Sequence, residues 1–422
     1  MEQSPFWLDG LNRPAELKSA PLPARVDVAI VGAGYTGLNA ARVLLGHGAS
    51  AVVLEGHKVG WGASSRNGGM LTTGSKVPPQ VMFKRYGREL GREFWRVSLD
   101  SIDRVEEVIT EHEIDCDFAR TGQVALAYKP AHFEAMQKKV TWYEQNLDHA
   151  LRSIGPGELE TELGSKAYFG GLVDESAANL NPAAYVLGLG AAVARAGASL
   201  CQNTEVLGIE KSPNGYQIQT SQGVLRARDV LIATNGYTDR LIAGLRRRVF
   251  PVGSYIVVTE PLPNDVRRRL SPKNRVYYDS KNFLNYFRLT ADGRLLFGGR
   301  NDLSTGLDLR QSARRLRRRM LELFPYLEEY KISHSWSGQL GMTFDLMPHI
   351  GRINGVYYAL GFCGHGVSLA TYMGAEAGSL IAGEKKRSPF MEIKHPTRFF
   401  YRNRPWFLPL AAQIYRLMDR VS

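Results

Sequence analysis

A strand, a glycine-rich turn and a helix near the N-terminus constrain this chain more than any other feature. The apolar residues 26–31 have the length and β-branched content of a buried parallel strand, and Gly32, Gly34 and Gly37 follow at once. At this spacing the first glycine permits a tight turn, the second lets backbone approach a pyrophosphate, and the third lets helix pack on strand. The helix N-terminus would receive the phosphates. The pattern therefore predicts a dinucleotide site.

Glu55 strengthens this interpretation. It follows a predicted strand at residues 51–54, after a helix that we expect over residues 36–45 and that stops near Gly46 and Gly48. A carboxylate at this place accepts hydrogen bonds from the hydroxyls of an adenosine ribose. A glycine triplet alone usually marks an ordinary turn. A strand, a helix and an acidic residue at the expected spacing around it favour nucleotide binding.

Length and composition set further bounds. With 422 residues the chain exceeds the usual size of a single core, so we expect two intertwined or tandem domains. The three cysteines show no paired spacing, which predicts no disulfide framework and no metal site. No signal-like N-terminus and no run of 18 apolar residues is present, so we expect neither secretion by that route nor a membrane span.

The net charge of +12 is concentrated at the C-terminus, where residues 385–422 hold nine basic residues and only two acidic ones. Residues 398–421 interleave arginines with aromatic side chains and then place apolar residues at helical spacing. Such a basic amphipathic helix is typical of a contact with a membrane surface. The alternative, which we favour, is a helix that packs on its own protein. The basic runs 246–248, 267–269 and 314–319 either extend a positive face or are solvated helix edges.

The rest of the chain alternates between helical and strand patterns. Residues 84–150 predict an inserted helical layer, and Asn181 followed by Pro182 predicts the start of a helix over residues 183–196. A later group of strands alternates enough to form a second, distinct sheet. The predicted strands are residues 204–210, 216–220, 224–227, 230–233, 252–259, 285–289, 295–298 and 356–360.

Five motifs in order carry a resemblance. They are the N-terminal unit, GWGASSRNGG at 60–69, the strand at 230–233 with ATNG, WSGQLGMTFDLMPHIG at 336–351, and GFCGHG at 361–366 with the helix after it. Together they resemble the D-amino-acid-oxidase-like flavoproteins, FAD enzymes that oxidise C–N bonds and include sarcosine and glycine oxidases. SSRNGG, NYFRLTADGRLLFGG and the WSG…T…MPHIG arrangement look most like the gamma-glutamylputrescine oxidase branch. The resemblance covers residues 1 to about 384.

The resemblance implies an α/β fold. A Rossmann-like FAD-binding domain, with a parallel sheet and the GxGxxG turn, would be interleaved with an α+β substrate domain on a mainly antiparallel sheet. The expected boundaries are 25–83, 168–245 and 336–384 for the FAD-binding domain, 84–167 and 246–335 for the substrate domain, and 385–422 for the basic tail.

The loop after the second strand supplies several expected FAD contacts. Ser64 and Ser65 offer hydroxyls to pyrophosphate oxygens, and Gly68 and Gly69 let backbone pass close to a flat ring. Arg66 adds a fixed positive charge. Donors aimed at the flavin favour its reduction, because the ring gains negative charge.

The remaining expected contacts lie in later motifs. The turn at 361–366 offers backbone amides and a helix N-terminus, the resemblance places Val206 beside adenine, and Trp336 and Met70 would face the ring. The full set is Gly32, Gly34, Tyr35, Thr36, Gly37, Glu55, Ser64, Ser65, Arg66, Asn67, Gly68, Gly69, Met70, Val206, Thr234, Asn235, Gly236, Trp336, Gly361, Gly364, His365, Gly366, Val367 and Ser368.

Comparison within the family also limits the chemistry. Some sarcosine-oxidase relatives link the flavin to a cysteine just before a TxD segment, where this chain has Gly338, so we expect noncovalent FAD and a Cys363 that is merely packed. Sarcosine-type enzymes bind a carboxylate through an arginine and a lysine at positions that hold Thr73 and Ser368 here. Sarcosine is therefore disfavoured.

Another group must orient the substrate, and three residues are the candidates. On a strand Tyr286 and Arg288 share one face, and glycine-oxidase-like relatives carry a substrate-binding arginine near this point. Arg288 would anchor a carboxylate, unless it is a strand-edge arginine paired with a surface acid. His365 would point at the ring or else satisfy a nearby carbonyl.

We expect an FAD-dependent amine or amino-acid oxidoreductase. The neutral amine would bind over the flavin, a hydride would pass from its α-carbon to flavin N5, and water would hydrolyse the imine. Oxygen or a quinone would accept the electrons. The protein would be cytoplasmic, either free or peripheral on the inner face of the membrane.

Two alternatives remain open. The same motifs suit a cyclic imino-acid oxidase or dehydrogenase, acting on pipecolate or proline and passing electrons to the respiratory chain. The positive charge suggests a tRNA-modifying flavoprotein, but the chain has no recognisable RNA-binding module, so we expect no nucleic-acid partner.

Overall fold

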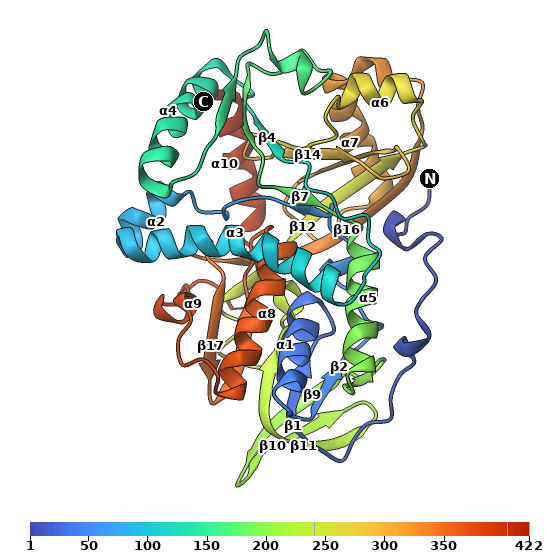
Figure 1. The fold of residues 1–422 in the computed structure, drawn as a ribbon, viewed down its shortest axis with the longest axis vertical. Coiled ribbons are helices and arrows are strands. Elements are labelled where there is room, and N and C mark those ends of the chain that lie inside the picture. Colours follow the sequence, from blue (N-terminus) through green and yellow to red (C-terminus); the bar gives the residue numbers. More distant parts are fainter. Residues whose placement is uncertain (240, 403, 422) are drawn as a thin grey trace.

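Two β-sheets organise the molecule, one above the other in Figure 1. The computed structural model describes residues 1–239, 241–402 and 404–421. The lower sheet contains the predicted glycine-rich unit, and the upper one contains the strands that the sequence assigns to a second sheet. The two sheets confirm the predicted fold class.

The lower sheet has a parallel centre. Strands β17, β18, β11, β1, β2 and β8 lie in this order, and each neighbouring pair is parallel except β17 with β18. The hairpin of β9 and β10 extends from β11. Apolar runs form these strands because both faces of the sheet are covered. The bounds are β1 Arg25–Val31, β2 Ala51–Leu54, β8 Ser199–Cys201, β9 Val206–Ser212, β10 Gly215–Thr220, β11 Gly223–Ile232, β17 His349–Ile353 and β18 Val356–Leu360.

Three helices cover one face of this sheet: α1 (Tyr35–Gly46), α5 (Pro182–Arg195) and α8 (Gly366–Ala382). Helices α1 and α8 approach closely because α8 carries Gly374 and Gly378 at the contact. A Cβ added to Gly374 would lie 2.3 Å from the carbonyl oxygen of Thr36 on α1. The absence of these side chains therefore sets the distance between the two helices.

The predicted start of α5 is confirmed. The side chain of Asn181 accepts hydrogen bonds from the backbone N–H groups of Ala183 and Ala184, both at 3.1 Å. This N-cap satisfies donors that the first turn of the helix leaves free, and Pro182 occupies the first helical position.

The upper sheet is almost wholly antiparallel. Its order is β16-β12-β15-β14-β13-β4-β6-β5, and only β13 with β4 is parallel. Tyr277, Phe287 and Phe297 stack on neighbouring strands, with ring centroids 5.2 and 5.8 Å apart. The bounds are β4 Gln123–Leu126, β5 Arg152–Ile154, β6 Gly171–Asp174, β12 Val249–Thr259, β13 Val276–Asp279, β14 Asn285–Leu289, β15 Leu295–Gly299 and β16 Ile332–Thr343.

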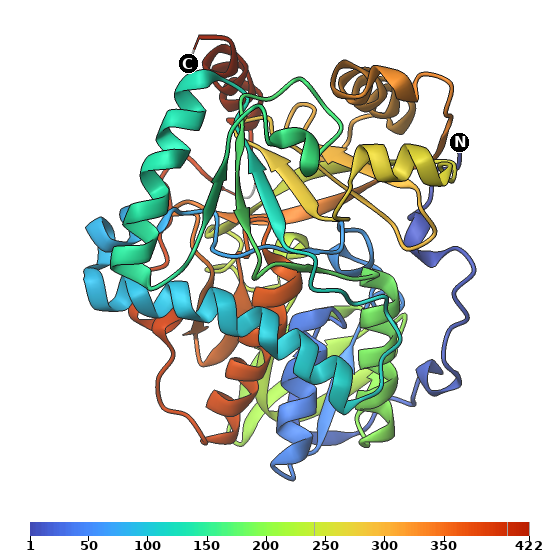
Figure 2. The ribbon, with the colours of Figure 1, turned by 45° about the horizontal axis from the view of Figure 1, so that its top comes forward.

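Helices also surround the upper sheet and separate it from the lower one. Figure 2 shows α3, in light blue, crossing between the two halves. On α7 the buried side chains of Leu316 and Met320 face the sheet core, while Arg314 and Arg318 are exposed, as expected of a solvated basic edge. The remaining bounds are α2 Pro79–Tyr86, α3 Arg88–Glu111, α4 Pro130–Leu147, α6 Asn264–Leu270, α7 Leu309–Leu323, α9 Pro389–Glu392 and α10 Leu408–Val421, with a short strand pair β3 Met70–Leu71 and β7 Ala178–Asn179.

Some sequence expectations need correction. The strands predicted at 224–227 and 230–233 are one continuous strand, β11, because the polar residues between them face solvent without interrupting the pairing with β1. The region 84–150 is not purely helical, since β4 lies within it. Both β6 and β16 pair in the upper sheet although their residues fall largely in the ranges assigned to FAD binding, so the domain boundaries stay a proposal. Among the described residues, no helix is both long and apolar enough to cross a bilayer.

The contact between α1 and α8 gives a stability prediction. Gly374→Ala should lower the free energy of unfolding by about 1–3 kcal/mol, because the added methyl meets a backbone oxygen that cannot rotate away. Gly46→Ala is the matched control, since a Cβ there meets nothing within 4 Å. Urea unfolding measures both variants. Equal stability of the two would contradict the proposed contact.

Candidate active site

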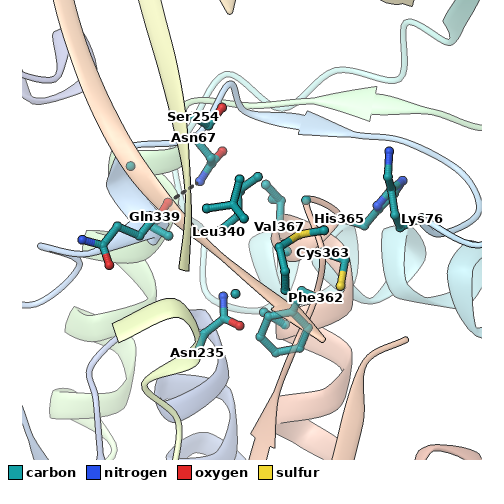
Figure 3. Close-up of a pocket in the computed structure, with 18 of the residues that line it drawn as sticks. Asn67, Lys76, Asn235, Ser254, Gln339, Leu340, Phe362, Cys363, His365 and Val367 are labelled. Atoms are coloured by element: carbon teal, nitrogen blue, oxygen red, sulfur yellow. Dashed lines mark hydrogen bonds between the residues drawn. The ribbon is translucent and has the colours of Figure 1, made fainter. Parts of the chain in front are cut away.

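One large cavity of about 1150 Å³ runs between the two sheets. Its walls come from the turn before α1, residues 61–68, the turn before α8, and strands β12 and β16 of the upper sheet. Figure 3 shows these segments around one space, with Lys76 and His365 on one side of it and Asn235 below. The cavity therefore spans both halves of the molecule.

At one end lies the predicted nucleotide site. The two carboxylate oxygens of Glu55 accept hydrogen bonds from the backbone N–H groups of Ala33 and His57, at 2.9 and 3.0 Å. Ser64 Oγ accepts from the N–H of Tyr35 at 3.2 Å. An added Cβ on Gly37 would lie 2.0 Å from the oxygen of Gly32, so the third glycine serves helix packing as predicted and does not line the cavity.

Hydrogen bonds hold the loop of residues 61–68, which follows this site in the sequence. Arg66 donates from Nε to the oxygen of Trp61 at 2.8 Å, and Trp336 Nε1 donates to the oxygen of Arg66 at 2.9 Å. Trp336 is fully buried and lies outside the cavity wall, so it supports the loop instead of facing the ring as predicted. Asn67 also bonds within the loop, since its Oδ1 accepts from the N–H of Gly69.

At the other end of the nucleotide half, the turn before α8 opens into the cavity. Asn235 Oδ1 accepts from the N–H of Gly361 at 3.0 Å, which ties the ATNG segment to this turn. Gly361 and Gly364 have φ of +86° and +103°, values that favour glycine. Gly34 before α1 and His365 before α8 both line the cavity, so two helix N-termini face it.

Most of the predicted residues come together. Those that line the cavity are Gly32, Gly34, Tyr35, Thr36, Glu55, Ser64, Arg66, Asn67, Gly68, Met70, Val206, Thr234, Asn235, Tyr286, Gly364, His365, Gly366 and Val367. Those outside its wall are Gly37, Ser65, Gly69, Gly236, Arg288, Trp336, Gly361 and Ser368.

The position of Arg288 does not support its predicted role as a carboxylate anchor. Its guanidinium donates to the oxygen of Gly68 at 2.8 Å, to Asn179 Oδ1 at 2.8 Å and to the oxygen of Leu180 at 2.6 Å. Burial lowers the pKa of this side chain to about 9. Nor is it the strand-edge arginine of the alternative interpretation, because it is buried and bonds to carbonyl oxygens.

Two cations that the sequence did not single out line the cavity instead, Lys76 and Arg300. Burial lowers the pKa of Lys76 to about 8, and it also lowers the pKa of Arg300. Within the described part of the chain no carboxylate pairs with either cation. The groups that raise their pKa values are the thiol of Cys363, for both, and the phenols of Tyr286 and Tyr415, for Arg300. Arg300 directly follows β15, but the sequence alone does not show that it lines the cavity.

His365 lies beside these cations. Burial, Lys76 and Arg300 together lower its pKa to about 4, so the imidazole is neutral at pH 7. Its Nδ1 is buried and has no hydrogen-bond partner among the described residues. An unpartnered imidazole nitrogen at the cavity is available to a bound molecule.

The cavity continues into the upper half. Here Tyr143 and Tyr278 line it, together with Lys139 and Asp279. Burial lowers the pKa of Lys139 and raises that of Asp279 to about 6. Thr73, named as the position of a missing arginine, donates its hydroxyl to Asp174 at 2.6 Å.

Residues with metal-ligand geometry lie elsewhere. Among the described residues, three such groups come together where the N-terminal segment meets β16, outside the cavity wall: Glu2, Asp9 and His334. His334 Nε2 is 2.6 Å from Asp9 and 3.4 Å from Glu2. We interpret this cluster as a fastening of the N-terminus to β16, and a metal-free protein stays a prediction.

Comparison with known proteins identifies the family. Residues 27–380 match the model of the DAO family, described as FAD dependent oxidoreductase. The chain belongs to this family. It is therefore an FAD-dependent oxidoreductase, as the five motifs predicted.

Individual relatives are similar over nearly their whole length. The flavoenzyme is 31% identical to the "Probable oxidoreductase OrdL" of Haemophilus influenzae, over 98% of this chain and 97% of that one. It is 30% identical to the "Gamma-glutamylputrescine oxidoreductase" of Escherichia coli, over 99% of each. The solved structure of glycine oxidase from Geobacillus kaustophilus has the same fold, with a TM-score of 0.75, 24% identity and coverage of 89% of this chain and 100% of that one.

The residues present fit FAD. Glu55 stands where a ribose would be held, the N-terminus of α1 would meet the pyrophosphate, and the turn at 361–366 with α8 would meet the flavin end. Burial raises the pKa of Cys363, whose thiol contacts the oxygen of Gly361 and the hydroxyl of Thr343. A buried, bonded thiol agrees with the expectation of noncovalent FAD.

Glu55 gives a prediction about cofactor affinity. Glu55→Ala should weaken FAD binding at least tenfold, because a hydrogen bond to a charged group contributes about 1.5–3 kcal/mol. Apoprotein prepared by acid precipitation, then titrated with FAD, gives the dissociation constant, and release of the flavin in that step tests noncovalent attachment as well. Glu210→Ala, on exposed β9, is the control. Unchanged affinity for Glu55→Ala would contradict the assignment.

Proposed function

We propose that this flavoenzyme oxidises the C–N bond of an amine that carries a carboxylate, and that gamma-glutamylputrescine is its preferred substrate. The observation that carries the proposal is the pair Lys76 and Arg300, two cations without a carboxylate partner in the described cavity. The 30% identical relative named for gamma-glutamylputrescine supports the same substrate.

The cation pair has an electrostatic consequence. Buried charges without partners are costly, and an anion that enters the cavity removes part of this cost. A substrate carboxylate beside Lys76 and Arg300 would therefore bind strongly and raise the pKa of Lys76 back toward its ordinary value. The site selects molecules that bring negative charge.

The same charges prepare the amine for oxidation. Positive neighbours disfavour a second positive charge, so they favour the neutral amine, which is the form that can lose a hydride. His365 is neutral, and its Nδ1 can exchange a hydrogen bond with the amine. No strong general base is then required. Bound FAD supplies the electron acceptor, and water hydrolyses the product imine to a carbonyl compound and ammonia.

The length of the cavity favours an extended substrate. Beyond the cations it reaches the chamber around Tyr143 and Tyr278, where Lys139 and Asp279 offer charges of opposite sign. A gamma-glutamyl group has both a carboxylate and an ammonium group, and its aliphatic amine extends away from them. Such a molecule uses both parts of the cavity.

A second candidate rests on a specific electrostatic interaction. Both Lys76 and Arg300 influence His365, so the cations lie close to the turn that faces the flavin end. A carboxylate held there would stand next to the reacting carbon, as in pipecolate, proline or another amino acid. The distance between carboxylate and amine in the true substrate separates the two candidates.

A substrate panel tests the function. Gamma-glutamylputrescine should bleach the flavin absorbance in anaerobic stopped-flow, and putrescine, which lacks the carboxylate, should bleach it far less efficiently. Lys76→Met and Arg300→Met should each raise the KM for gamma-glutamylputrescine about 100-fold, a loss of ~2.7 kcal/mol typical of a buried charge-assisted bond, and should not raise the KM for putrescine, which has no carboxylate to lose.

The outcomes discriminate between the candidates. Faster bleaching by pipecolate, proline or N-methyl amino acids favours the second one, and no bleaching by any member of the panel overturns amine oxidation. Admission of air after reduction then shows whether oxygen accepts the electrons; a failure to reoxidise would favour a quinone.

The pKa of Lys76 gives a pH prediction. Its ammonium group is charged below pH about 8 in the free enzyme, so carboxylate binding should be complete below that pH and weaken above it. The falling limb of kcat/KM near pH 8 should move to higher pH in Lys76→Arg, because arginine stays charged. A limb unmoved by this substitution would assign the titration to another group.

A further inference from the structure

The C-terminal helix α10 has two distinct faces. Its inner face packs on the upper half of the protein through the buried side chains of Leu408 and Ala412. The carboxylate of Asp419 accepts from the N–H groups of Asn282 at 2.7 Å and Phe283 at 2.9 Å. The helix is therefore docked on its own protein, as we favoured from the sequence.

The outer face of α10 is apolar and exposed. Leu410, Ile414 and Leu417 recur at helical spacing and are 62%, 50% and 62% exposed. Trp406, just before the helix, is 62% exposed, and Phe399 is 87% exposed. Eight of the fourteen large apolar side chains that are exposed among the described residues lie between residues 399 and 418, so this surface differs from the rest of the protein.

Positive charge lies in the segment that directly precedes this apolar row. Arg398, Arg402 and Arg404 are exposed, and none of them makes an ion pair with a described residue. The two acidic residues of the tail are already engaged, since Asp419 caps the 282–283 segment and Glu392 pairs with Arg387. The surface thus combines apolar side chains with unneutralised arginines.

We propose that the outer face of α10, with Trp406 and the three arginines, docks on a bilayer of anionic phospholipid. Apolar side chains would enter the boundary between headgroups and acyl chains, and the arginines would meet the lipid phosphates. Charge complementarity decides against a second copy of the chain, because a symmetric contact would bring the same arginines together.

Docking would place the substrate cavity beside the membrane. The inner side of the same segment, through Phe407, Leu408, Ala411 and Tyr415, forms part of the cavity wall. One helix is therefore both the wall of the reaction chamber and the proposed lipid contact.

Cosedimentation of the full-length holoprotein with vesicles tests the proposal. Binding should be at least tenfold stronger to vesicles of phosphatidylcholine with phosphatidylglycerol than to phosphatidylcholine alone, and it should weaken at high salt. The combined change Leu410→Glu with Ile414→Glu, and separately Arg402→Glu with Arg404→Glu, should each abolish it. Leu207→Glu, on an exposed site of β9, is the matched control and should bind normally. Flavin absorbance and activity with the preferred amine verify that each variant is folded.

The fluorescence of Trp406 gives an independent readout. Emission should shift to the blue when anionic vesicles are added, and the shift should disappear in Trp406→Phe. The proposal is overturned if folded wild-type protein does not bind anionic vesicles, if it binds both lipids equally, or if Leu207→Glu loses binding as well. It is also overturned if light scattering without lipid shows a dimer that the α10 variants dissociate, since a second copy would then cover this face.

Discussion

The buried guanidinium of Arg288 is the interaction on which the arrangement of the two halves depends. It belongs to β14 of the upper sheet, yet it donates to the oxygens of Gly68 and Leu180 in the nucleotide half. A buried charge is stable only when its donors are satisfied, and here backbone oxygens and the side-chain oxygen of Asn179 satisfy them without a carboxylate. The loop that approaches the flavin end is thereby fixed relative to the strands that form the substrate chamber.

Much of this architecture could be predicted from the sequence because it depends on local patterns. The strand at β1, the glycine turn and Glu55 follow one another within thirty residues or so, and each carries its own periodicity or spacing. The two cations proposed to bind the substrate follow no such pattern. Tyr286 and Arg288 share one face of a strand, yet only Tyr286 reaches the cavity, because the loop near Gly68 captures the guanidinium. Lys76, in the loop between β3 and α2, and Arg300, directly after β15, reach one cavity only through the packing of distant segments, which no local pattern encodes.

Groups of positive charge or positive dipole line both the nucleotide end and the middle of the cavity. The nucleotide end offers helix N-termini and backbone amides, and the middle holds Lys76 and Arg300 beside a neutral His365. Under the proposed function, cofactor and substrate would both meet positive groups, although different groups supply them. The same sign of charge would then hold phosphates and keep a bound amine unprotonated.

The order of strands in the lower sheet has a consequence for the synthesis and folding of the protein. β1 is flanked by β2 and by β11, and β11 pairs in turn with β18, whose residues lie more than three hundred positions after those of β1. Pairings this distant close slowly, because chain entropy must be lost before contacts form. The nucleotide site, although encoded near the N-terminus, cannot be completed until almost the entire chain has left the ribosome. We therefore expect cofactor insertion to be late, and a truncated translation product would expose an unfinished sheet edge to other chains.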